Sequence, residues 1–178
     1  MKTCKIDHVL IVLCKSRSQL SLAFSRVHEA YEGGKLKGPL KGVNMPFEFY
    51  INWYSDHDQS EQEKSMHDLI IDSDCKYIIA SLIGDQSSLY HEWAHAYYHL
   101  NPEFQIIVKE MFDALPDHIK KVIIYDLQMK GYSSVNFLDE FQAYLIENAN
   151  EFGKKCYNIL VPIHLKLREL CKRPILNL

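Results

Sequence analysis

The sequence predicts an α+β fold, with a small mixed β-sheet followed by a mainly helical half. The segments typical of strands, which are rich in β-branched or aromatic residues, all lie before Gly84. After Gly84 the chain reads as successive helices separated by proline, glycine and asparagine. Strands that precede helices in this way are typical of α+β proteins. With 178 residues, 47% of them hydrophobic, we expect a single domain spanning 1–178.

The first half is expected to supply the sheet. A helix is predicted over Ser18–Tyr31, ending at Gly33-Gly34, because its apolar residues have helical spacing. Lys35–Pro46 reads as a loop, since glycines and prolines lie among its lysines, and the polar Ser55–Lys64 as a loop or a helix start. The expected strands are Lys5–Leu13, Phe47–Tyr54 (FEFYINWY) and Lys76–Ile83 (KYIIASLI).

The second half is expected to fold into helices bounded by capping residues. Asparagine followed by proline can open one helix, proline can open the next, and glycine can end it. Ser133 or Ser134 can cap a further helix, and Pro162 is expected to kink or divide the last one. The expected ranges are Ser88–Leu100, Pro102 to about Ala114, Pro116–Gly131, Val135–Glu151 and Cys156–Cys171.

Composition narrows the classes of partner and compartment. A net charge of −3 and a pI near 6.3 give no basic excess for a phosphate backbone, so we expect no nucleic acid partner. No apolar run reaches the length of a membrane span or of a signal-peptide core. The five cysteines are odd in number and contain no Cys-x-x-Cys pair, which indicates reduced thiols. We expect a cytoplasmic protein. Export by a route that uses no cleavable signal is the alternative.

The strongest functional motif is His91-Glu92-Trp93-Ala94-His95, an H-E-x-x-H pattern inside a predicted helix. Residues four apart on a helix share a face, so both imidazoles can bind one metal ion. Glu92 flanks that face and is expected to reach a water on the metal rather than the metal itself. The motif therefore predicts two zinc ligands and a general base. Two histidines packed on a helix without a metal are the alternative.

A catalytic zinc commonly has three protein ligands and a water in the fourth position. The variant of the motif with a third histidine six residues after the second is excluded, since that position is Asn101. His99 continues the four-residue spacing, but one more turn places it about 5–6 Å farther along the helix axis. We expect His99 to make a hydrogen bond in the core or to one of the metal ligands.

The third ligand is expected on the helix that Ser133 or Ser134 opens. Glu140 lies in a segment whose apolar neighbours would bury part of that helix, and a partly buried carboxylate needs a partner such as zinc. Glu147 and Asp139 are alternative ligands, and an ordinary exposed glutamate is the alternative state of Glu140.

With these residues the chain resembles the gluzincin metallopeptidases, zinc enzymes whose third ligand is a glutamate on a later helix. The resemblance rests on H91-E-W-A-H95 and on E140-F-Q-A143, and it covers about Lys76 to Glu151. In size the chain is similar to small single-domain members, the minigluzincin type. The resemblance implies a zincin-like fold with an active-site helix, a glutamate-ligand helix and a strand whose edge holds an extended substrate. Either FEFYINWY or KYIIASLI is expected to supply that edge.

The expected activity is that of a zinc metallopeptidase, with an endopeptidase favoured, acting on a peptide or protein substrate. One Zn2+ ion would be held by His91, His95 and Glu140, and Glu92 would activate the water for attack on the peptide bond. Candidate oxyanion donors, chosen by residue type and region alone, are Tyr144, Tyr132, Tyr98 and His118. Tyr144 stands where many relatives carry an aspartate that orients a zinc ligand.

Two other readings use the same residues. A regulatory or interaction protein could retain zinc without proteolytic activity, although a structural site would gain nothing from a base at Glu92. A metal-dependent hydrolase of non-peptide amides is the other reading, and a substrate screen separates it from a peptidase.

Overall fold

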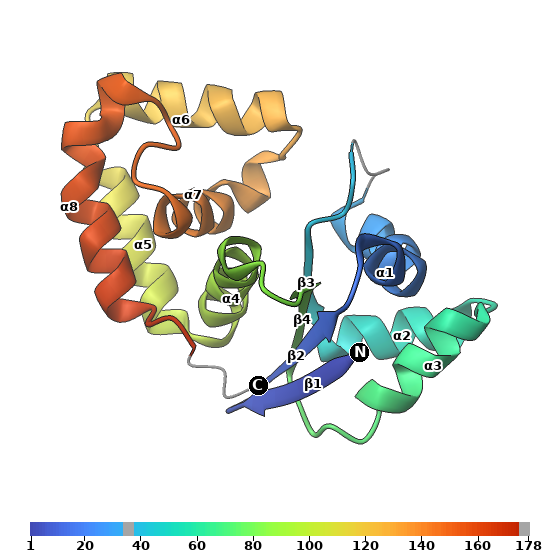
Figure 1. Ribbon diagram of the computed structural model, residues 1–178. Helices are drawn as coiled ribbons and strands as arrows, with labels where there is room; N and C mark the ends of the chain where they lie inside the picture. Colours follow the sequence, from blue (N-terminus) through green and yellow to red (C-terminus); the bar gives the residue numbers. More distant parts are fainter. Residues whose placement is uncertain (34–37, 175–178) are drawn as a thin grey trace. The chain divides into compact units, whose positions relative to one another are not determined.

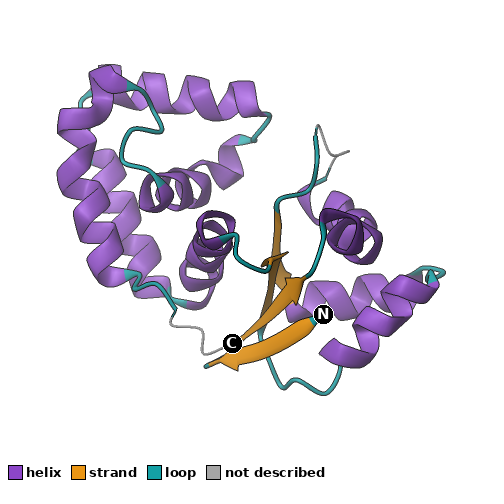
Figure 2. Cartoon of the chain, in the orientation of Figure 1, coloured by secondary structure: helices purple, strands orange, loops and turns teal. Residues whose placement is uncertain are grey.

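The computed structural model describes residues 1–33 and 38–174. The described chain divides into two compact units, the first formed mainly by Met1–Ala96 and the second by Tyr97–Arg173. The first unit contains the sheet with its helices, and the second is helical (Figures 1 and 2). The predicted α+β class, with strands early and helices late, is confirmed.

In residues 1–33 and 38–174 the sheet has four strands, in the order β1-β2-β4-β3. The central strands β2 and β4 run parallel, whereas β1 and β3 pair antiparallel with their neighbours, so the sheet is mixed as predicted. All six residues of β2 and five of the six in β4 are buried, as expected for interior strands. The strand ranges are β1 (Lys2–Ile6), β2 (Val9–Cys14), β3 (Gly42–Pro46) and β4 (Tyr77–Leu82).

Three helices cover one face of the sheet and enclose the main apolar core of the first unit. The first of them begins at the cap Ser16, whose side chain accepts a hydrogen bond from the Gln19 amide. It ends at Gly33, whose φ of +72° is the left-handed conformation that favours glycine. The helices are α1 (Arg17–Glu32), α2 (Phe47–Asp56) and α3 (Glu61–Ile70).

Helix α4 (Gln86–Leu100) follows β4 after a short turn. Gly84 adopts a φ of +89°, and the Asp85 carboxylate accepts a hydrogen bond of 3.1 Å from the Ser88 amide, which caps the helix start. Side chains alternate between the two faces of a sheet, so Asn44 and Tyr77 lie opposite the core residues that neighbour them in sequence. Asn44 contacts α4, and α4 therefore lies against this second face (Figure 1).

The second unit is built around α7, which packs against the other helices of this unit. The Phe141 ring contacts those of Phe112 and Phe152, at centroid distances of 5.1 and 6.0 Å. Asn101 caps the first helix of this unit and Gly131 ends the second, as predicted. The helices are α5 (Pro102–Asp113), α6 (Asp117–Lys130), α7 (Phe137–Glu147) and α8 (Lys154–Leu170), with a 3-10 turn over Ser134–Asn136.

The largest error of the sequence analysis concerns Phe47–Tyr54, which is not a strand but most of helix α2. The segment is rich in residues that favour strands, yet Tyr50 and Trp53, three apart, are the buried pair. This spacing buries one face of a helix against the core, and the burial outweighs the weak strand preference of the aromatic residues.

Three further predictions about the sheet are corrected. Lys5–Leu13 is not one strand but parts of β1 and β2, which turn at Asp7, where φ is +50°. Of the loop predicted over 35–46, residues 35–37 lie outside the described residues and 42–46 form the edge strand β3. KYIIASLI does form β4, as predicted, but it is an interior strand and cannot offer an edge.

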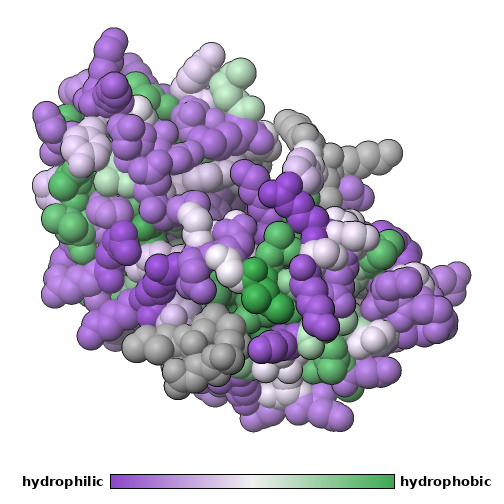
Figure 3. Space-filling model, in the orientation of Figure 1, coloured by the Kyte–Doolittle hydropathy of each residue, from purple (hydrophilic) through white to green (hydrophobic). Residues whose placement is uncertain are grey.

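The helical predictions are closer. The range predicted as Val135–Glu151 contains α7, which is shorter and ends at Glu147, and Pro162 lies inside α8 without dividing it. Among the described residues no helix has both the length and the apolar character needed to cross a membrane. On the face drawn in Figure 3, hydrophilic residues cover most of the surface and hydrophobic ones form small patches.

Candidate metal centre and general base

His91 and His95 lie one turn apart on α4 and direct their imidazoles toward each other. Their Nε2 atoms are 3.2 Å apart, and their rings meet nearly edge to face at 4.9 Å between centroids. His95 is buried and His91 is partly buried. The helix predicted from the motif is present, and it brings the two nitrogens together as the four-residue spacing requires.

The spacing of the two nitrogens fits a shared metal ion. Two nitrogen ligands at about 2.0–2.1 Å from a tetrahedral zinc lie about 3.3 Å apart, close to the separation seen here. In the absence of an ion, neutral imidazoles can share one hydrogen bond at this distance.

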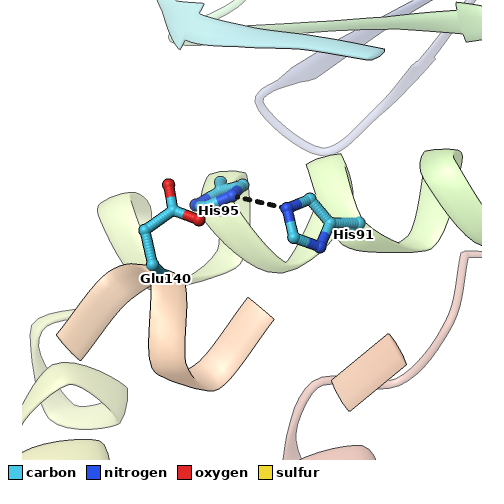
Figure 4. A group of neighbouring side chains, drawn as sticks. All are labelled: His91, His95 and Glu140. Atoms are coloured by element: carbon cyan, nitrogen blue, oxygen red, sulfur yellow. Dashed lines mark hydrogen bonds between the residues drawn. The ribbon is translucent and has the colours of Figure 1, made fainter. Parts of the chain in front are cut away.

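Glu140 is the acidic residue that joins this pair. Ligand atoms of His91, His95 and Glu140 all lie within 4.8 Å of one another (Figure 4). Glu140 comes from the start of α7 and is only 6% exposed, so it is not an ordinary surface glutamate. Among the described residues, this group includes neither Asp139, which accepts a hydrogen bond from Gln142, nor Glu147. The three residues could hold a metal ion, and the donor set alone does not specify zinc.

Glu92 is not in that group and faces the sheet. The residue is 8% exposed, and its carboxylate accepts a 2.8 Å hydrogen bond at Oε2 from the Asn44 side-chain amide. The Tyr77 hydroxyl in turn donates to the Asn44 carbonyl oxygen, also at 2.8 Å. The carboxylate is thereby held by a side chain of β3, and its role as a base stays a prediction.

Gly42 leaves the space that the Glu92 side chain fills. A Cβ atom at position 42 would lie 2.2 Å from Glu92 Oε1 and 2.7 Å from Cδ and Cγ. Contacts so short are essentially never seen, so any larger residue at position 42 would force β3 or the Glu92 side chain to shift.

His28 on α1 is a further titratable group near Glu92. Burial lowers the pKa of His28, and the negative charges of Glu92 and Glu29 offset part of that shift. The imidazole is therefore held toward its neutral form.

Tyr132 and Tyr144, two of the predicted oxyanion donors, form a pair. Their hydroxyl oxygens are 3.1 Å apart, and the Lys130 ammonium lies 4.8 Å from the centre of the Tyr144 ring. Burial raises the pKa of Tyr144 to about 12, although the hydrogen bond with Tyr132 lowers it in part. Tyr144 therefore keeps its proton at neutral pH and can donate a hydrogen bond.

The other predicted donors are in different surroundings. His99 and His118 are exposed, so His99 does not lie in the core. Its role beside a metal ligand stays a prediction. Tyr98 is partly buried, and burial followed by the charge of Asp139 raises its pKa.

All five cysteines lie in the described part of the chain, and none of them forms a disulfide. Burial raises the pKa of Cys14 to about 11 and that of Cys171 to about 12, which disfavours the thiolate needed for metal binding.

The sequence analysis missed Gly42, Asn44 and Tyr77. The alternation of apolar Val43 and Met45 with Gly42 and Asn44 is the strand signal that could have placed the first two on one face. The glycine and proline in the same stretch indicated a loop instead.

Comparisons of the chain with protein-family models, with curated proteins and with solved structures gave no match.

Proposed function

We propose that the protein is a zinc-dependent peptidase in which His91, His95 and Glu140 bind the ion and Glu92 is the general base. The observation that carries the proposal is the convergence of two imidazoles and a buried carboxylate, with a second buried carboxylate directly after the first histidine. This donor set, two histidines and a glutamate, is one that catalytic zinc uses.

The chemistry divides between the ion and the chain. Zinc, when bound, polarises the carbonyl of the substrate and lowers the pKa of a bound water to about 7. Glu92 takes a proton from the attacking water and returns it to the leaving amine, so the carboxylate is regenerated. A hydroxyl of the Tyr132 and Tyr144 pair is the proposed donor to the developing oxyanion.

Strand β3 is the proposed binding edge for an extended peptide. Within the described residues it pairs with a strand on one side only, and it carries Asn44, which contacts Glu92. A peptide added to this edge through backbone hydrogen bonds would lie along the residues that hold the base.

The test compares the parent protein with Glu92→Gln and Glu140→Gln in zinc content and in hydrolysis of a mixed peptide library. Glu92→Gln should keep one zinc per chain and lose about 10²–10⁴-fold in kcat, because only the proton acceptor is removed. Glu140→Gln should weaken zinc binding, since a neutral amide is a poorer ligand than a carboxylate.

Glu103→Gln, at an exposed position on α5, is the matched control and should behave as the parent. A parent that retains zinc but cleaves no peptide in the library would instead favour the regulatory zinc-binding protein. Cleavage of non-peptide amides alone would favour the other hydrolase.

A further inference from the structure

A buried chain of two hydrogen bonds runs through three elements of the first unit. It leads from the Tyr77 hydroxyl on β4 to the Asn44 side chain on β3, and from there to the Glu92 carboxylate on α4. Both bonds are 2.8 Å long, and all three residues are buried. Burying polar groups without hydrogen-bond partners costs free energy of folding, and here the three side chains supply partners to one another.

The chemistry of the three groups determines which group donates and which accepts in each of the two hydrogen bonds. An ionised carboxylate only accepts hydrogen bonds, whereas an asparagine side chain accepts at its oxygen and donates at its nitrogen. The Tyr77 hydroxyl occupies the Asn44 oxygen, and the amide nitrogen is thereby directed at Glu92 Oε2.

The second carboxylate oxygen is restrained by shape. Glu92 Oε1 occupies the space beside Gly42 that any larger residue would fill. Gly42 and Asn44 are two apart on β3 and so present the same face of the strand to α4. One oxygen is held by a hydrogen bond and the other by packing.

We infer that Asn44 is a positioning residue for Glu92 and that Tyr77 fixes the orientation of the Asn44 amide. The inference rests on the proposed function, in which Glu92 is the base. The terminal torsion of a glutamate is broad and poorly restrained by itself, and a misplaced base transfers protons slowly. Asn44 acts through Glu92 and does not contact the substrate or the ion in this role.

The kinetic test uses variants that remove one hydrogen bond at a time. Asn44→Leu keeps a similar volume and should lower kcat by about 10–100-fold, with KM within threefold of the parent and zinc content unchanged. Tyr77→Phe keeps the ring and should give a smaller loss of the same kind. Tyr50→Phe, at a buried tyrosine in the core on the other face of the sheet, should leave kcat unchanged.

Parent kcat in Asn44→Leu, or an equal loss in Tyr50→Phe, would overturn the inference. A thermal melt of each variant shows whether it is folded at the assay temperature. A variant that fails to fold is replaced by Asn44→Ser, for which the same loss of kcat is expected.

A second readout does not depend on activity. In the zinc-free parent, NMR should show a side-chain amide, assigned to Asn44 by its absence in Asn44→Leu, that is protected from hydrogen exchange. Glu92→Ala should reduce this protection by more than tenfold, because the buried acceptor is gone. An unprotected Asn44 amide in the parent overturns the inference whether or not the protein cleaves peptides. A protected amide in an inactive parent instead overturns the proposed function and supports the hydrogen-bond chain.

Discussion

Tyr144 lies one helical turn after Glu140 on α7, and its hydroxyl forms a hydrogen bond with the Tyr132 hydroxyl. Its raised pKa, about 12, means that burial favours the neutral phenol in the folded protein. An unfolded tyrosine titrates near 10, so the unfolded chain loses this proton first as pH rises.

Stability should therefore depend on Tyr144 at high pH. The contribution of the buried Tyr144 phenol to the free energy of unfolding is fully present below pH 10 and is lost as pH rises toward 12. In that range Tyr144 has released its proton in the unfolded chain but not in the folded protein. Tyr144→Phe should make the free energy of unfolding fall less steeply between pH 10 and 12, as measured by urea denaturation. It should also remove a tyrosine titration step near pH 12 from the absorbance at 295 nm.

Tyr125→Phe on α6 is the control, because that ring is exposed. An unchanged titration in Tyr144→Phe would show that Tyr144 is not the buried phenol that the structure describes.

At the residue scale, the sequence predicted those site residues whose relation depends on a single helix. His91, Glu92 and His95 were predicted because four-residue spacing on one helix fixes their relation, and Glu140 because apolar neighbours implied its burial. Asn44 and Tyr77 reach Glu92 through the pairing of β3 with β4. Strand register is a long-range property, and no local pattern specifies it.

Strand β3 is the element on which the candidate base depends most. Gly42→Ala would place a Cβ atom within 2.7 Å of three Glu92 side-chain atoms, so the strand or the carboxylate must move. We expect a loss of roughly 1–3 kcal/mol in the free energy of unfolding and a lower kcat, as for other overpacked sites. Urea denaturation and peptide hydrolysis measure the two effects.

Gly38→Ala is the matched control, since a Cβ atom there meets nothing within 4 Å and the glycine is exposed. Equal effects of the two substitutions would contradict the close approach of β3 to Glu92.

At the element scale, the helices after Gly84 were predicted well because caps and breakers are local signals. Asn101 and Gly131 act at the predicted positions. The predictions for the segments that form strand β3 and helix α2 were wrong for one reason. Each segment is compatible with two kinds of secondary structure, and burial against the core decides between them. Tyr50 and Trp53 fit both a strand-rich composition and a helical spacing, and packing selects the second.

For the whole molecule, the α+β class followed from the order of strands and helices along the chain. The boundary between the two compact units falls inside helix α4, after Ala96, where the sequence has no linker. Composition therefore could not reveal it. That the chain forms one zincin-like domain over 1–178 stays a prediction.

The central claim is that two imidazoles of α4 and a carboxylate of α7 bind a single ion. The most direct measurement is a crystal structure of the protein loaded with one equivalent of zinc, with anomalous scattering recorded on both sides of the zinc absorption edge. We predict one anomalous peak bonded to Nε2 of His91, Nε2 of His95 and a carboxylate oxygen of Glu140. A peak bound by other residues, or a Glu140 side chain directed away from the histidines with no acidic group in its place, would contradict the claim.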